Sequence, residues 1–218
     1  MSAKTLKPAA IDLSAPPGWF GKLPAAGDFV SRRLPDDFLH AWDDWLQHGL
    51  VAARERYGDG WLDAHGGHAE DGVRRFWLGP DVLGDVCWTG LLTPSVDRVG
   101  RRFPLTIAAP LAWHSSSLAI ALAARGWFRR LEALLSRVDA DMSVDAFDKE
   151  LVRSGPPDSM TVDFATDRLA ETLQGGGAGK ATERSIWWRA DALEPGQFAC
   201  FGGLPPASAF ASLLVGRG

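Results

Sequence analysis

Residues 73–110 read VRRFWLGPDVLGDVCWTGLLTPSVDRVGRRFPLTIAAP, and this stretch decides the fold class. It contains three apolar runs, at 73–78, 86–93 and 103–110, separated by connections rich in the turn-forming residues Gly, Pro and Asp. We expect three strands that pair antiparallel, because such short links leave no room for a crossover helix. Pro104 predicts an edge position or a bulge near the start of the third strand, since proline cannot donate a ladder hydrogen bond.

The residues before this stretch predict two more strands, at 18–24 and 29–34, joined by a turn at Gly27 and Asp28. A helix of about 20 residues is expected to begin at Pro35, because proline suits the first helical turn and the acidic residues that follow it favour the positive end of the helix dipole. The apolar stripe of this helix, at spacings of three and four, consists of Phe38, Trp42, Trp45, Leu46, Leu50 and Ala53.

The residues after this stretch predict helices, then strands, then a short helix. The expected elements are a long helix at 118–138, a helix at 143–153, a mobile surface loop at 169–180, strands at 185–189 and 198–201, and a helix from Pro205 onward. Gly126 marks either close packing or a break into two helices. This order predicts a single-domain α+β sandwich, with helices on a largely antiparallel sheet, over residues 18–218. Residues 1–17 are expected to form a flexible tail.

The composition excludes several classes of protein. A formal charge of −4 with a pI near 5.7 argues against a general nucleic-acid-binding protein, which carries a basic face. The sequence has no run of about 18 apolar residues and no signal peptide, so we expect a cytoplasmic protein without membrane insertion. Cys87 and Cys200 lie in apolar strands and are expected to be buried, inert thiols. The 10 Trp against 1 Tyr indicate an aromatic core, with a contact surface as the alternative.

Three groups of residues invite a catalytic or ligand-binding interpretation, and each is weak. The glycine-rich loop 175–180 has the Gly-Lys of a phosphate-binding loop but lacks its first Gly and its final Ser or Thr. Asp28 and Asp97 follow sharp turns and form an acid–base pair only if the fold brings them together. A histidine- and carboxylate-bearing loop at 65–71 does not have the spacing of a common metal site. We therefore assign no catalytic, cofactor-binding or metal-binding residue.

Arginines gather beside two turns, and two interpretations stay open for them. In one, they tie the turns to Asp28 or Asp97, or are simply solvated. In the other, they form a partner-docking patch on an otherwise acidic protein, because the guanidinium fork suits carboxylates and phosphates. The candidate partner-binding residues are Arg32, Arg33, Asp97, Arg98, Arg101 and Arg102.

Two segments resemble the TagF family, accessory proteins of bacterial type VI secretion. The first signature is GWFGKLPAAGDFVSRRLP at 18–35, and the second is LLTPSVDRVGRRFPLT at 91–106. The similarity is strong from Gly18 to about Trp113 and weaker afterwards, although FGGLP at 201–205, before the final helix, also fits. Two long signatures in the family's order make chance similarity improbable.

The resemblance implies regulation rather than catalysis. Proteins similar to this one act as post-translational repressors of the secretion machine, by binding its forkhead-associated scaffold protein. Their fold resembles longin and signal-recognition-particle-receptor domains. The leading hypothesis is therefore a non-enzymatic regulator without a cofactor. The alternative is a nucleotide- or metal-dependent enzyme or ligand-binding protein that uses the loop Gly175–Lys180 or the pair Asp28 and Asp97, and a third possibility is a structural subunit of the machine.

Overall fold

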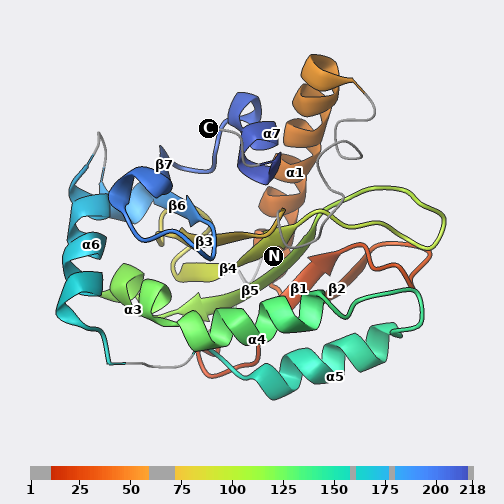
Figure 1. The fold of residues 1–218 in the computed structure, drawn as a ribbon, viewed down its shortest axis with the longest axis horizontal. Coiled ribbons are helices and arrows are strands. Elements are labelled where there is room, and N and C mark those ends of the chain that lie inside the picture. Colours follow the sequence, from red (N-terminus) through yellow and green to blue (C-terminus); the bar gives the residue numbers. More distant parts are fainter. Residues whose placement is uncertain (1–10, 59–71, 158–160, 177–179, 216–218) are drawn as a thin grey trace, which may run out of the picture.

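Seven antiparallel strands form one sheet in the order β2-β1-β5-β4-β3-β6-β7 (Figure 1). The computed structural model describes residues 11–58, 72–157, 161–176 and 180–215. The strands are β1 (Gly18–Gly21), β2 (Val30–Arg32), β3 (Arg74–Leu78), β4 (Cys87–Thr93), β5 (Leu105–Leu111), β6 (Arg184–Trp188) and β7 (Ala199–Gly202). The helices are α1 (Asp36–Tyr57), α3 (Ser117–Ala123), α4 (Arg125–Leu135), α5 (Val144–Ser154), α6 (Phe164–Gly175), α7 (Ala207–Val215) and the 3-10 helices η1 (Ala181–Glu183) and η2 (Pro195–Gln197).

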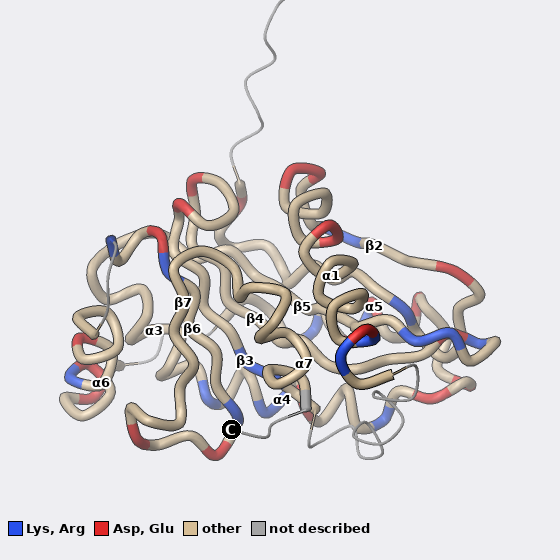
Figure 2. Tube along the Cα trace, turned by 90° about the horizontal axis from the view of Figure 1, so that it is seen from above, with Lys and Arg blue, Asp and Glu red and all other residues tan. Residues whose placement is uncertain are grey.

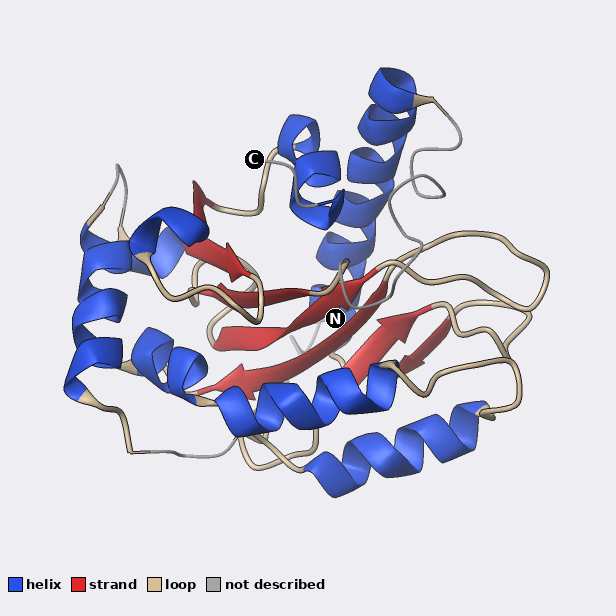
Figure 3. Cartoon of the chain, in the orientation of Figure 1, coloured by secondary structure: helices blue, strands red, loops and turns tan. Residues whose placement is uncertain are grey.

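Helices cover both faces of the sheet, which confirms the expected α+β sandwich (Figures 1 and 3). One core lies between the sheet and helices α3 to α6, and the other lies between the sheet and helices α1 and α7. Successive residues of a strand pack into opposite cores. Phe76 and Leu78 belong to the core beneath α1 and α7, whereas Trp77 between them belongs to the core beneath α3 to α6. These central strands are buried on both faces, and for this reason their sequences are almost continuously apolar.

The three strands expected within 73–110 form the centre of the sheet and pair antiparallel as predicted. At the middle of the sheet, Gly90 lies opposite Phe76 on one side and Ala108 on the other. A Cβ at Gly90 would overlap the backbone oxygen of Ile107 and lie 2.9 Å from the ring of Phe76. The glycine therefore leaves room for the ring of Phe76 and for the backbone of β5.

The edge position predicted from Pro104 was wrong, because β5 is a central strand between β1 and β4. The alternative, a bulge, does not occur in its pairing with β4, which is continuous from Leu105 to Leu111. Pro104 precedes the strand, which begins at Leu105. Inside β5, Pro110 lies opposite Trp88 of β4, beyond the segment 106–108 that pairs with β1. Its missing N–H thus falls where β5 has no partner on the β1 side, which is how a central strand tolerates proline.

The long helix α1 carries the predicted apolar stripe and supplies much of the second core. Two of its indole N–H groups are satisfied by distant partners: Trp42 donates to the hydroxyl of Thr106 at 2.8 Å, and Trp45 donates to the carbonyl of Pro205 at 2.8 Å. Of the tryptophans that the structure describes, only Trp113 is exposed. The tryptophan surplus therefore forms the core rather than a contact surface.

Two helical expectations need correction. The segment 118–138 is two helices rather than one, as one of the two interpretations of Gly126 predicted, but the break falls at Ala124 and α4 ends at Leu135. Gly126 falls in the first turn of α4, where its low helix propensity costs less than in a helix interior. The segment 169–175, expected to be loop, belongs to α6, whose start is capped by Asp163 accepting from the N–H of Thr166.

The tail and the cysteines also differ from expectation in part. Residues 1–10 lie outside the described residues, but 11–17 contain a turn and Ile11 packs against the second core. Cys87 is buried, and burial raises the pKa of its thiol to about 11. Cys200 is exposed, because the edge strand β7 has one open face. Within the described ranges, no helix is long and apolar enough to cross a membrane.

Candidate partner-binding surface

Two turns from distant parts of the sequence meet at one end of the sheet. The hydroxyl of Ser95 donates to the carbonyl of Lys22 at 2.7 Å, across 73 positions of the chain. The backbone N–H of Arg98 donates to the carbonyl of Ala26 at 2.9 Å. The loop between β1 and β2 is therefore hydrogen-bonded to the loop between β4 and β5, and the two loops form one structure.

Asp97 is the centre of this structure. Its Oδ2 accepts from Lys22 Nζ at 3.0 Å and from Arg101 Nε at 2.7 Å. Its Oδ1 accepts from the backbone N–H groups of Val99 at 3.0 Å and Arg101 at 2.8 Å. One carboxylate thus closes its own turn and holds the other loop through Lys22.

The electrostatics of this cluster favour the ionised carboxylate. Burial alone would raise the pKa of Asp97, but the hydrogen bonds from Lys22 and Arg101 hold it well below its usual range. The side chains of Asp97 and Lys22 are 0% and 6% exposed, so each buried charge needs the other. Asp97 is therefore buried beneath the predicted docking patch and supports it, rather than being one of its contact residues.

The turn that Asp97 holds exposes several other side chains to solvent. Val99 is 67% exposed at the tip of the turn, and Arg98 and Arg102 are exposed on either side of it. The guanidinium group of Arg101 contacts Asp97 and the carbonyl of Gly27, yet its side chain is 58% exposed. Figure 2 shows the basic residues as a run in the loop that joins β4 to β5, at the edge of the molecule.

An aromatic group adjoins this basic turn. Phe29, 47% exposed, lies between Phe20 and Phe103 with ring centroids 6.0 and 4.7 Å away, and Lys22 Nζ lies 5.0 Å from its centroid. We call the exposed residues Phe29, Arg98, Val99, Arg101 and Arg102 the signature surface, because all lie in the two segments singled out from the sequence. It combines apolar and cationic groups on rigid turns, which suits a protein partner.

The two remaining candidates, Arg32 and Arg33, lie on β2 and immediately after it. Arg33 makes two hydrogen bonds to the carboxylate of Asp148 on α5, at 2.9 and 2.7 Å, and its φ of 59° is left-handed. Trp19 donates to the same carboxylate at 2.8 Å. These contacts, that of Arg33 first, lower the pKa of Asp148. Arg33 therefore joins α5 to the sheet, whereas Arg32 is exposed.

The alternative sites show little that favours chemistry. Asp28 is exposed and accepts from the N–H of Phe29 at 2.8 Å, the role of a turn residue, while Asp97 pairs with cations rather than with a second carboxylate. The glycine-rich loop follows helix α6 and precedes η1 and β6, the reverse of the strand-to-helix order of a phosphate-binding loop. Residues 177–179 and the histidine-bearing loop 65–71 lie outside the described residues. Elsewhere in the described chain, no cluster of metal-ligating side chains occurs.

Sequence patterns did not reveal the partners of these charges. Lys22 is one basic residue in an aromatic strand, and nothing in its spacing connects it to Asp97. Asp148 lies 115 positions from Arg33. The usable signal was the presence of a charge inside an apolar stretch, which indicates a buried ion pair but not its partner.

The fold and this surface define a single-domain α+β protein in which Asp97 and Lys22 join the loop between β1 and β2 to the loop between β4 and β5. Residues 18–153 match the TagF N-terminal domain, a type VI secretion system-associated family. The chain belongs to this family, as its two signatures predicted. It is also similar to the crystal structure of PA0076 from Pseudomonas aeruginosa PAO1, with 34% identity and a TM-score of 0.71 over 93% of this chain and 95% of that one. A comparison with curated proteins found no match.

Proposed function

We propose that this protein is a non-enzymatic regulator that represses a type VI secretion system in the cytoplasm by binding its forkhead-associated scaffold protein. Membership of a secretion-associated family supports a role in that system. The repressor activity and the scaffold partner are what the family resemblance implies, and the signature surface is where we place the contact.

The observation that supports this proposal best is the locking of the two signatures around Asp97. A carboxylate that accepts four hydrogen bonds fixes the turn in one conformation. A rigid turn loses little conformational entropy when it binds, so its exposed groups contribute more to affinity. The side chains of Arg98 and Val99 project from this turn and take no part in the contacts described above. The side chains of Lys22, Asp97 and Arg101, by contrast, form those contacts.

The first experiment is co-purification of the tagged protein from its native host, with mass spectrometry of the proteins recovered. The proposal expects the forkhead-associated scaffold among them. Recovery of soluble, folded protein without any component of the secretion system would count against it.

The same experiment with variants tests the surface. Arg98→Glu reverses an exposed charge on the turn, and Arg129→Glu makes the same change on the exposed side of α4. We expect Arg98→Glu to lose the scaffold and Arg129→Glu to retain it. Arg101 is unsuitable for this purpose, because its guanidinium also holds Asp97 and Gly27 in place.

A further inference from the structure

The last strand of the sheet, β7, is an edge strand whose backbone is open to solvent. Cys200 and Gly202 are exposed, and a Cβ built at Gly202 or at Gly203 would meet nothing within 4 Å. Edge strands are usually kept from pairing with another chain by charged residues or proline. The segment 198–203 reads FACFGG and contains neither, so nothing in it prevents a further strand from pairing here.

The pairing of β7 with β6 shows which of its backbone groups face outward. The N–H of Gly203 donates to the carbonyl of Glu183 at 2.6 Å. Backbone groups alternate in direction along an antiparallel strand, so in this register Phe201 bonds to β6, whereas Cys200 and Gly202 point away from it. Among the described residues, none hydrogen-bonds to these outward N–H and C=O groups. The edge therefore presents two donors and two acceptors, all directed away from the sheet.

The opposite edge of the sheet, at β2, is protected by the protein's own side chains. The guanidinium group of Arg32 donates to the carbonyl of Ser31 at 2.9 Å. The carboxylate of Asp28 accepts from the N–H of Phe29, just before the strand begins, at 2.8 Å. Charged side chains of this kind hinder the approach of a further strand. The two edges thus differ, and the difference favours strand pairing at β7.

The outward edge of β7 is complementary to itself. When two copies of β7 run antiparallel about a twofold axis at Phe201, Cys200 of each copy lies opposite Gly202 of the other. Every outward N–H then faces an outward C=O of the second copy. The two Phe201 residues lie opposite each other at the axis, in the closer, non-hydrogen-bonded position in which aromatic pairs form. A second copy of this chain is therefore the occupant that this edge fits.

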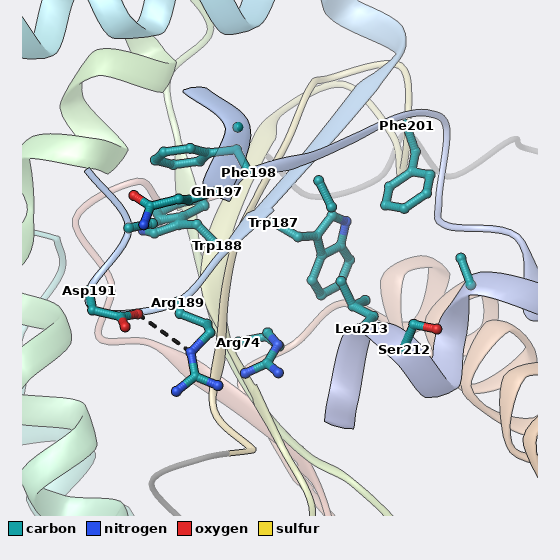
Figure 4. Close-up of a pocket in the computed structure, with 14 residues that line it drawn as sticks. Arg74, Trp187, Trp188, Arg189, Asp191, Gln197, Phe198, Phe201, Ser212 and Leu213 are labelled. Atoms are coloured by element: carbon teal, nitrogen blue, oxygen red, sulfur yellow. Dashed lines mark hydrogen bonds and ion pairs between the residues drawn. The ribbon is translucent and has the colours of Figure 1, made fainter. Parts of the chain in front are cut away.

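Phe201 is placed to take part in such a contact. It packs against the second core and is only partly buried. Figure 4 shows its ring on the same side of the sheet as Trp187 and Leu213. The ring is thus held by the core and still accessible, and a second Phe201 would cover its exposed part. Burial of this apolar surface adds to the backbone hydrogen bonds.

We propose that two copies of this protein pair through β7, so that their sheets join edge to edge about a twofold axis at Phe201. The contact is a single short strand, so the dimer is weak and forms as the concentration rises. The proposal does not rest on the regulatory function, since β7 contains no residue of the signature surface.

Sedimentation velocity at protein concentrations from about 10 µM to about 500 µM tests the pairing, and we expect a monomer that converts to a dimer. Gly202→Pro removes one outward N–H from each copy without removing a bond to β6, and should weaken the dimer at least about tenfold. Gly202→Ala keeps this N–H and has room for its Cβ, so it should dimerise like the unmodified protein. A monomer at every concentration, or equal dimerisation of the two variants, would overturn the proposal.

Cross-linking places the contact at β7. The register makes the two Cys200 residues diagonal neighbours on one face, with Cα atoms about 7–8 Å apart, within reach of bismaleimidoethane. Cys87 is buried, so the cross-linked dimer should form through Cys200 and disappear with Cys200→Ser. If thermal unfolding shows that Gly202→Pro does not fold, Cys200→Pro removes the other outward N–H and should weaken the sedimenting dimer as strongly. A dimer that does not cross-link through Cys200 would contradict the proposal.

Discussion

The ammonium group of Lys22 lies 3.0 Å from the carboxylate of Asp97, and these two buried residues are 75 positions apart in the sequence. One comes from the first signature and the other from the second. Their ion pair therefore joins the two segments by which the sequence resembles its family. It fixes the turn that carries Arg98 and Val99 without being exposed itself.

Breaking this pair should destabilise the whole protein. Lys22→Met leaves a buried carboxylate with one cation fewer, and we expect the melting temperature to fall by about 5 °C or more. Thermal unfolding followed by circular dichroism measures this. In an Asp97→Asn background the same substitution should cost less, because the charge that Lys22 compensates is then absent. Equal effects in both backgrounds would show that the two residues are not coupled.

The depressed pKa values of Asp97 and Asp148 predict acid sensitivity. Both groups are more acidic in the folded protein than in the unfolded chain, so the unfolded chain binds protons first as the pH falls. Their stabilising contribution is complete above the unfolded value of about 4 and is lost as the pH falls toward the folded values. Urea unfolding between pH 7 and pH 2 should show this loss, and Asp148→Asn should show a smaller one.

The left-handed conformation of Arg33 predicts an unusual order of stabilities. Arg33→Ala and Arg33→Gly both lose the contacts with Asp148, but only glycine adopts a φ of 59° without strain. Arg33→Gly should therefore be more stable than Arg33→Ala by about 1 kcal/mol. Chemical denaturation of the two variants decides the point, and alanine as the more stable residue would contradict the backbone conformation.

The centre of the sheet should not tolerate a methyl group at Gly90. Gly90→Ala forces a Cβ against the backbone of β5, and we expect a loss of about 3 kcal/mol in the free energy of unfolding. Gly175→Ala is the matched control, because a Cβ there meets nothing within 4 Å. At the end of α6 it should be neutral or slightly stabilising. Similar losses in both variants would contradict the packing described for β4 and β5.

The two thiols should react very differently. Cys87 is buried, and burial raises the pKa of its thiol to about 11. Cys200 is exposed, and partial burial of its thiol also raises its pKa. At pH 8, Ellman's reagent should modify Cys200 in the folded protein and reach Cys87 only after denaturation. Cys200→Ser should remove the reaction of the folded state, and any remaining fast reaction would show that Cys87 is accessible.

The parts of the fold that followed from the sequence are those with local causes. The helix α1 was predictable because its buried residues recur at helical spacing and because its start has Pro35 and two acidic residues. The central strands were predictable from their apolar runs and short links. Pro104 misled because the position of a strand in its sheet depends on which distant strand pairs beside it, here β1.

The candidate surface was predictable only in outline. The arginine-bearing turn is visible in the sequence, and its location in the fold is as expected for a loop between two strands. Which charges pair with each other was not visible, since Lys22 and Asp148 find their partners through tertiary packing. Among the predicted residues, Asp97, Arg33 and Arg101 hold other parts of the fold in place, so a substitution there would also disturb the structure. The exposed Arg98 is the sharper position for a test.

The central claim is that the turn built on Asp97 binds the scaffold protein, and the most direct test is calorimetric titration of purified protein with the purified forkhead-associated scaffold. We expect a saturable complex that weakens with added salt, because the contact includes exposed arginines. Arg98→Glu should lower the affinity at least about tenfold, because it places a charge of the opposite sign against the scaffold protein. Arg129→Glu should leave the affinity unchanged. No heat of binding with the unmodified protein, or equal affinity for both variants, would contradict the claim.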